Sequence, residues 1–210
     1  MTFLDVGANI GFYTALAAKR VGPSGKIIAL EPDPESHTFL KQTIAANNAT
    51  NVIALPIAAA ATRGRLNLFV SSDNRGDNRL YRPDATTAAH WQPVEVETAP
   101  VDELLEQRGV EHVDLIKIDV QGAEGGVIAG LERTIRRSPG LVLLTEFWPH
   151  GLRQAGTDPK IFLEKLSGLG LDLFELTGKG HTVPLTDFDV LINRFQGRRY
   201  TNIVGRRQAR

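Results

Sequence analysis

The chain contains no cysteine in its 210 residues, which excludes disulfide bonds, a thiolate nucleophile and cysteine-based metal sites. It also lacks an apolar run near the ~18 residues that a membrane-spanning helix requires. Lys and Arg together number 24, as do Asp and Glu, so the formal net charge is zero. The basic excess typical of nucleic-acid binders is therefore missing. We expect a cytoplasmic protein that neither spans a membrane nor binds nucleic acid.

Apolar runs alternate with helical patterns along most of the chain. Strands are predicted at Thr2–Val6, Lys26–Glu31, Asn51–Leu55, Val113–Val120, Gly140–Phe147, Leu171–Leu176 and Tyr200–Val204. Helices are predicted near Ile10–Val21, Glu35–Asn48, Val101–Arg108, Gly125–Arg137 and Asp158–Leu169. This alternation predicts an α/β fold with a doubly wound sheet. The length fits one domain over residues 1–210.

The middle of the chain breaks this alternation. Ala58–Ala61 and Arg65–Val70 flank Thr62-Arg63-Gly64 at a spacing that predicts a hairpin. Ser71–Pro93 is polar and irregular, and a loop of that length inside a compact domain is usually functional. We therefore expect residues 56–100 to form a hairpin and loop insertion near the site. A basic tail at residues 205–210 is predicted to be solvated.

A glycine-containing loop joins the first predicted strand to the first helix. Asp5, Gly7, Asn9 and Gly11 fit the spacing Asp-x-Gly-x-(Gly/Asn)-x-Gly, in which Asn tolerates left-handed backbone angles. A dinucleotide loop instead requires Gly-x-Gly-x-x-Gly, and here Asn9 and Phe12 occupy its second and third glycine positions. No Gly-Lys-Ser/Thr follows, which excludes a Walker phosphate loop. The loop is predicted to bind S-adenosylmethionine.

Glu31 supports this ligand because it ends the second predicted strand, 20 residues after Gly11. A carboxylate there accepts hydrogen bonds from both hydroxyls of an adenosyl ribose. Two other readings remain open from the residues alone: the glycines form an ordinary turn, or Glu31 caps the helix that follows Pro32.

A second concentration of polar residues lies in Asp114–Glu124. Strand alternation places Lys117 and Asp119 on one face. Because a buried charge requires a partner, Lys117 is expected to pair with Asp119 or Glu146. Asp119 ends a strand beside the first one, which favours a functional role, whereas Glu124 is also explained as a carboxylate near a helix N-terminus.

With these segments in view, the chain resembles the FkbM-type methyltransferases over almost all of residues 3–204. The likeness rests on Phe3–Gly11, Leu30–Pro34, Ile116–Glu124, Thr145–Trp148 and Tyr200–Asn202. It implies a class I methyltransferase fold, with a Rossmann-like, seven-stranded, mostly parallel sheet and an antiparallel last strand. It also implies methyl transfer to oxygen, often on sugars or natural-product intermediates.

The resemblance also implies which residues bind the cofactor and act on the acceptor. We expect S-adenosylmethionine to be bound by Asp5, Gly7, Ala8, Asn9, Gly11, Glu31, Pro32, Ala58 and Asp119. The base that removes the acceptor's proton is predicted among Asp119, Glu146, His150 and His181, with Asp119, Glu146 and His150 preferred. Trp148 and the Ser71–Pro93 segment are expected to border a small-molecule or glycosidic acceptor.

Three alternatives remain at this point. A divalent metal held by Asp119 and another carboxylate would acidify the hydroxyl, although no ligand motif supports one. A nicotinamide-dependent Rossmann oxidoreductase is disfavoured by the loop spacing. A non-catalytic adenosyl-binding protein is the third possibility. The absence of Asn-Pro-Pro-Tyr or Asp-Pro-Pro-Tyr near Asp119 disfavours methylation of base amines.

Overall fold

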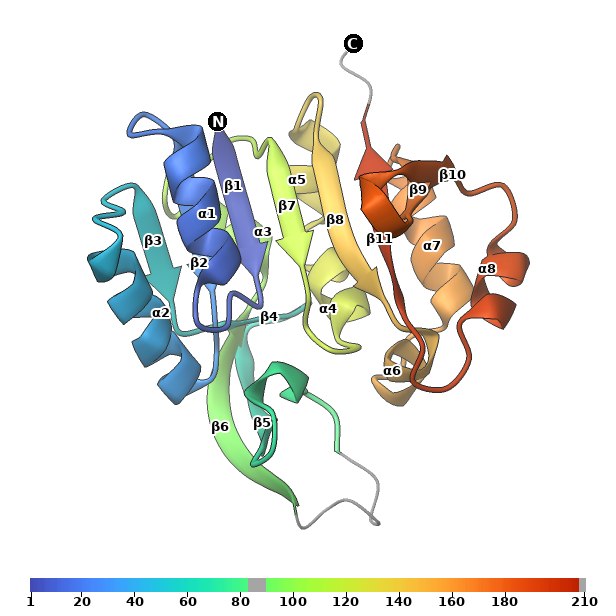
Figure 1. Cartoon of the computed structure of the whole chain (residues 1–210), viewed down its shortest axis with the longest axis horizontal. Helices are drawn as coiled ribbons and strands as arrows, with labels where there is room; N and C mark the ends of the chain where they lie inside the picture. The colour runs from blue at the N-terminus through green and yellow to red at the C-terminus, as the bar shows by residue number, and fades with distance from the viewer. Residues whose placement is uncertain (83–89, 208–210) are drawn as a thin grey trace.

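The computed structural model describes residues 1–82 and 90–207. Its centre is an eight-stranded sheet in the order β10-β9-β11-β8-β7-β1-β2-β3 (Figure 1). These strands are β1 (Thr2–Val6), β2 (Lys26–Leu30), β3 (Val52–Leu55), β7 (Leu115–Ile118), β8 (Val142–Phe147), β9 (Asp172–Leu176), β10 (Thr182–Pro184) and β11 (Thr201–Arg206). The helices are α1 (Phe12–Val21), α2 (Pro34–Ala46), α3 (Val101–Glu106), α4 (Glu124–Ala129), α5 (Glu132–Arg137), α6 (Pro149–Gln154), α7 (Pro159–Gly168) and α8 (Phe188–Arg194).

The central sheet is mostly parallel. β1 pairs in parallel with both β2 and β7, and β8 continues the parallel run beyond β7. β11 is inserted antiparallel between β8 and β9. Chain order reverses at β1, between β2 and β7, so the carboxyl end of β1 is the place where an open α/β sheet binds ligands.

Helices cover both faces of this sheet. Phe3, Ile27 and Ala18 belong to a cluster under α1, and Leu40 of α2 packs with Ala8 and Ala29. The larger core lies on the opposite face, where α3, α4, α5 and α7 pack against side chains such as Leu4 and Ile116. The doubly wound α/β class with an antiparallel last strand is therefore confirmed.

A second, three-stranded sheet projects beyond the carboxyl ends of β1 and β7 (Figure 1). Its strands are β4 (Ala58–Ala59), β5 (Gly64–Ser71) and β6 (Trp91–Ala99), in the order β4-β6-β5. The predicted hairpin between Ala58–Ala61 and Arg65–Val70 is wrong, because β4 pairs with β6 in parallel and β5 pairs with β6 antiparallel. The true partner of β5 is β6, which begins at Trp91 near the end of the polar segment, a long-range pairing that local spacing does not reveal.

Other elements also differ from the prediction. The sheet has one strand more than the seven predicted, because Thr182–Pro184 folds back on β9. The predicted helix Gly125–Arg137 is two helices, α4 and α5. α6 and α8 were not predicted. Gly205 and Arg206 belong to β11, and Arg207 Nη1 donates to the carbonyl of Ile135 at 2.7 Å, so this part of the predicted tail is ordered; residues 208–210 lie outside the described residues.

None of the helices described is both long enough and apolar enough to cross a membrane.

Candidate active site

The loop between β1 and α1 has the backbone that its spacing predicts. Gly7, Asn9 and Gly11 have φ angles of 77°, 50° and 89°, in the left-handed region that favours Gly and Asn. A Cβ atom on Gly7 would lie 1.9 Å from the carbonyl oxygen of Asp119. Gly7 is therefore required because the loop passes directly over the end of β7.

A buried network of polar side chains from β1, β7 and α1 supports this loop. Lys117 Nζ donates to the Gly7 carbonyl at 2.6 Å and lies 3.4 Å from Asp5 Oδ1 and 3.8 Å from Asp119 Oδ2. Thr14 Oγ1 donates to the other Asp5 oxygen at 2.6 Å. Lys117 therefore pairs with Asp5 as well as with the predicted Asp119, and it is not ion-paired with Glu146. Its ammonium group therefore links the glycine loop to β7.

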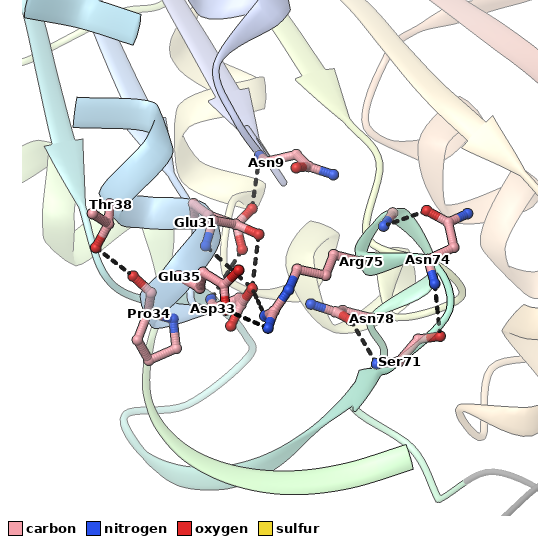
Figure 2. A network of polar contacts seen from close by, with 12 residues as sticks. Asn9, Glu31, Asp33, Pro34, Glu35, Thr38, Ser71, Asn74, Arg75 and Asn78 are labelled. Carbon is pink, nitrogen blue, oxygen red and sulfur yellow. Dashed lines mark hydrogen bonds and ion pairs between the residues drawn. The ribbon is translucent and has the colours of Figure 1, made fainter. Parts of the chain in front are cut away.

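Glu31 follows β2 and is almost fully buried. Its two carboxylate oxygens accept hydrogen bonds from the backbone N–H groups of Asn9, at 2.7 Å, and Asp33, at 2.9 Å (Figure 2). Burial raises the pKa of Glu31 to about 7, against the opposing effect of these two hydrogen bonds. The second lone pair of each oxygen is left for donors such as ribose hydroxyls.

Asp33 caps α2 and also holds the insertion against it. Its carboxylate accepts hydrogen bonds from Ser36 and from Arg75 Nη1, the latter at 2.8 Å, and Arg75 also pairs with Glu35 (Figure 2). Burial opposes ionisation of Asp33, but the donors from Ser36 and Arg75 outweigh it and lower its pKa. Arg75 belongs to the 3₁₀ turn η1 (Arg75–Asp77), which follows β5, so this ion pair fastens the insertion at the Glu31 end of the site.

A cavity of about 300 Å³ lies between the glycine loop, Glu31 and the insertion, a size within the range of small-molecule sites. Of the predicted cofactor residues, its lining includes Gly7, Ala8, Asn9, Glu31, Pro32, Ala58 and Asp119. Asp5 and Gly11 do not line it; Asp5 is fully buried beneath the loop, and Gly11 faces Leu40. Arg75, Asn78 and Arg79 of the insertion also line it, and sequence reasoning did not single them out.

The residues present fit S-adenosylmethionine. The left-handed backbone of the glycine loop allows close approach of a ligand. The two carboxylate oxygens of Glu31 line the cavity and can accept hydrogen bonds from ribose hydroxyls. Pro32, Ala58 and Leu68 offer apolar contacts for the adenine ring. We call this space the cofactor cavity.

A second cavity, of about 610 Å³, adjoins the first. It contains the predicted Glu146, Trp148 and His150, together with Asp73, Asp77, Arg79, Tyr81 and Trp91 from the segment predicted to border the acceptor. His181, the fourth candidate base, lines neither cavity. We call this space the acceptor cavity, after the role that the sequence predicts for its lining residues.

Gln121 and Arg79 are the residues that line both cavities. Gln121 has a φ of 54°, and its side-chain amide donates to Asp119 Oδ1 at 3.1 Å and to Glu146 Oε2 at 3.4 Å. Asp119 therefore stands on the cofactor side and Glu146 on the acceptor side of one hydrogen-bonded bridge. Gln121 lies within the segment Ile116–Glu124 that carries the family resemblance, but no sequence pattern indicates this bridging position.

Two carboxyl groups near the junction of the two cavities have raised pKa values. Burial, followed by the charges of Asp119 and Glu124, raises the pKa of Glu146 to about 8. Burial likewise raises the pKa of Glu124 to about 7, although one of its oxygens accepts backbone N–H groups from Val120 and Gly122. Within residues 1–82 and 90–207, no group of three His, Asp or Glu side chains is arranged to hold a metal ion.

The family model for the methyltransferase FkbM domain matches residues 5–170. The chain belongs to the FkbM methyltransferase family. Methyltransferase sdnD of Sordaria araneosa is 30% identical over 176 residues, covering 71% of this chain and 68% of that protein. The 2-O-methyltransferase NoeI of Sinorhizobium fredii is 28% identical over 147 residues, 64% of this chain and 59% of NoeI.

Solved structures show the same fold at low identity. The FkbM methyltransferase of Methylobacillus flagellatus aligns with a TM-score of 0.61 and 14% identity, covering 97% of this chain and 43% of that one. An O-methyltransferase from Bacillus cereus, solved in complex with SAH, aligns with a TM-score of 0.54 and 15% identity, covering 98% and 74%. The FkbM-type resemblance is confirmed. Residues 5–170 form an S-adenosylmethionine-dependent methyltransferase domain, and the oxidoreductase alternative is set aside.

Proposed function

We propose that this protein transfers a methyl group from S-adenosylmethionine to a hydroxyl oxygen of a small-molecule, sugar or glycoside acceptor. The observation that carries the proposal is the junction of the two cavities, where Gln121 bridges a carboxylate on the cofactor side to a carboxyl group on the acceptor side. The relationship to NoeI, a 2-O-methyltransferase, supports oxygen as the target.

The cofactor, when bound, supplies an electrophilic sulfonium methyl, and the electron pair of the broken C–S bond leaves with sulfur. We assign the Gly7–Asn9 backbone, Glu31 and Asp119 to holding it. The protein's remaining task is to hold the acceptor oxygen in line, and positioning of this kind supplies about 7–11 kcal/mol of a reaction barrier.

Glu146 is the base we favour among the predicted candidates. It lines the acceptor cavity, and burial raises its pKa to about 8, which makes its carboxylate more basic than an ordinary one. As the oxygen–methyl bond forms, the hydroxyl proton passes to Glu146, and efficiency is greatest when the base's pKa lies near the working pH. His150 lines the same cavity, with its ring 5.6 Å from that of Trp148, and is the second candidate.

The test is transfer of a radiolabelled methyl group to a panel of neutral and carboxylate-bearing glycosides, with S-adenosylhomocysteine as the coproduct. A methyl ether survives mild alkali, whereas a methyl ester is hydrolysed, so the product identifies the acceptor atom. The rate should rise with pH through about 8 because Glu146 must be deprotonated. Glu146→Gln should lower the rate by about 10²–10⁴-fold.

Glu95→Gln is the matched control, because Glu95 is an exposed carboxylate that pairs with Arg65 on the small sheet, outside both cavities. An alkali-labile product, or a Glu146→Gln rate equal to that of the control, would refute the proposal. Failure of every hydroxyl acceptor would instead favour a non-catalytic adenosyl-binding protein.

A further inference from the structure

Arg79 is held rigidly in the wall of the acceptor cavity. Its guanidinium carbon lies 4.4 Å from the ring centre of Trp91, 5.4 Å from that of Tyr81 and 5.6 Å from that of Trp148. These separations fall within the range of cation–π attraction. Nε donates to the Asp77 carbonyl at 3.1 Å, and Nη1 donates to the Tyr81 hydroxyl at 3.3 Å. The fork is therefore oriented before any ligand arrives.

Within the described residues, the contacts of Arg79 give its charge no direct counter-ion. Among residues 1–82 and 90–207, no carboxylate forms an ion pair with it, and its Nη2 has no hydrogen-bond acceptor. Arg198 lines the same cavity, and it too lacks an ion pair in the described part of the chain. Arg75, four residues before Arg79, shows the contrast, since its guanidinium is paired with both Asp33 and Glu35.

Two of the acidic residues in this cavity lining are close to a partner or favour the protonated form. Asp73 lies 3.1 Å from His90, and Glu146, whose pKa burial raises to about 8, is mainly protonated at neutral pH. Asp77 contributes one carboxylate to the lining. Two guanidinium groups thus line one cavity, and neither is ion-paired with a carboxylate of the described residues.

We propose that Arg79, with Arg198 beside it in the cavity lining, binds a carboxylate group of the acceptor. An arginine fork matches a carboxylate in two parallel hydrogen bonds, and Arg79 has free donors in a fixed orientation. A phosphate carries about twice the charge of a carboxylate, so the Asp77 carboxylate in the same lining would repel it more strongly. The aromatic rings around Arg79 suit the apolar face of a sugar ring, so the ligand class is a uronic acid or a similar hydroxy-carboxylate.

This inference rests on the proposed function and deepens it. Arg79 and Glu146 line one cavity, so an acceptor anchored by its carboxylate at Arg79 presents a hydroxyl to Glu146 and the junction. The carboxylate is an anchor and is not methylated. Arg79 is thus a specificity-determining residue.

The test measures equilibrium binding of glucuronate, glucose and glucose 6-phosphate with S-adenosylhomocysteine present. The chain has two tryptophans, Trp91 and Trp148, and both line the acceptor cavity, so their fluorescence reports its occupancy; calorimetry gives the affinities independently. Glucuronate should bind about ten- to a hundredfold more tightly than glucose, as one charge-assisted interaction allows. Glucose 6-phosphate should bind more weakly than glucuronate.

Arg79→Gln should remove the preference for glucuronate over glucose, and Arg79→Lys should retain part of it because the charge stays but the fork is lost. Arg198→Gln should reduce the preference and does not disturb the aromatic contacts of Arg79. Arg65→Gln, an exposed arginine outside both cavities, is the control and should change nothing. Circular dichroism checks that each variant is folded.

Equal affinities for glucuronate and glucose, no detectable binding of glucuronate, a preference for the phosphate, or a preference that survives both Arg79→Gln and Arg198→Gln would each overturn the inference. These outcomes are separable from failure of the proposed function. Methyl ether formation on a neutral glycoside without a carboxylate preference refutes the anchor alone, whereas Arg79-dependent binding of glucuronate without any hydroxyl methylation refutes O-methylation alone.

Discussion

Replacing Gly7 with alanine should both destabilise the protein and impair cofactor binding. The new Cβ would lie 1.9 Å from the Asp119 carbonyl oxygen and 3.3 Å from a methyl of Val120. The oxygen cannot easily move away, because the Asp119 N–H donates to Val6 at 3.1 Å and holds the end of β7 against β1. The loop must therefore shift instead.

The expected loss of folding stability in Gly7→Ala has two parts. A residue with a side chain at φ 77° pays about 1–2 kcal/mol for the left-handed backbone. Overpacking against fixed backbone costs about 1–3 kcal/mol more, so the free energy of unfolding should fall by about 2–5 kcal/mol. A shifted loop also breaks the 2.6 Å hydrogen bond from Lys117 to the Gly7 carbonyl and moves the cofactor-binding backbone. The affinity for S-adenosylhomocysteine should therefore fall at least about tenfold, since 1.4 kcal/mol suffices for that.

Urea denaturation measures the first effect and calorimetric titration the second. Gly109→Ala is the matched control, because Gly109 has a φ of 63° but no heavy atom within 4 Å of an added Cβ. The free energy of unfolding of this variant should fall only by the backbone term of about 1–2 kcal/mol. Its affinity for S-adenosylhomocysteine should be unchanged. If Gly7→Ala is no less stable than Gly109→Ala and binds the ligand as tightly as the unmodified chain, the steric argument fails.

Three more substitutions probe the polar groups around the site. Glu31→Gln should weaken S-adenosylhomocysteine binding about ten- to a hundredfold by calorimetry, because an amide cannot accept from both Asn9 and Asp33; unchanged affinity would contradict the ribose assignment. Arg75→Gln should speed dissociation of the same ligand in stopped-flow measurements by releasing Asp33, and an unaltered rate would show that the ion pair does not retain it. Glu124→Gln should flatten the pH dependence of stability. Because the folded pKa of Glu124 is raised to about 7 from an ordinary 4.5, the folded state binds more protons at pH 5–7, so the free energy of unfolding should fall as pH rises through 7; equal slopes for variant and parent in urea melts would refute this.

The backbone of the glycine loop was predictable from the sequence because that loop is a local feature. The spacing from Asp5 to Gly11 defines one loop after one strand, and the left-handed angles of Gly7 and Asn9 follow from residue type. Asp5 shows the limit of the same reasoning. Its place in the motif suggested contact with the cofactor, yet it is fully buried and pairs with Lys117 and Thr14, because alternation along β1 turns its side chain into the fold.

The acceptor half depends on contacts between distant parts of the chain. Arg79 reaches Trp148 of the β8 end only because β5 pairs with β6 and carries the polar segment back to the site. The composition of Ser71–Pro93 indicated a functional loop, but no local pattern distinguishes Arg79 from Arg75 or Arg82. The role of each arginine was therefore not predictable from the sequence.

One short segment of the insertion serves both cavities. Asn78 Oδ1 accepts from the Ser71 N–H at 3.0 Å, and Asn74 Oδ1 accepts from the Gly76 N–H at 2.9 Å, so the turn between them is fixed by its own side chains (Figure 2). Arg75 leaves this turn toward Asp33, and Arg79 leaves it toward Trp148. Because the segment packs on the carboxyl ends of the central strands without forming part of them, its sequence can change without disturbing the α/β core. Acceptor preference should therefore be transferable by exchanging residues 71–82 between family members, while the glycine loop and Glu31 continue to bind the cofactor.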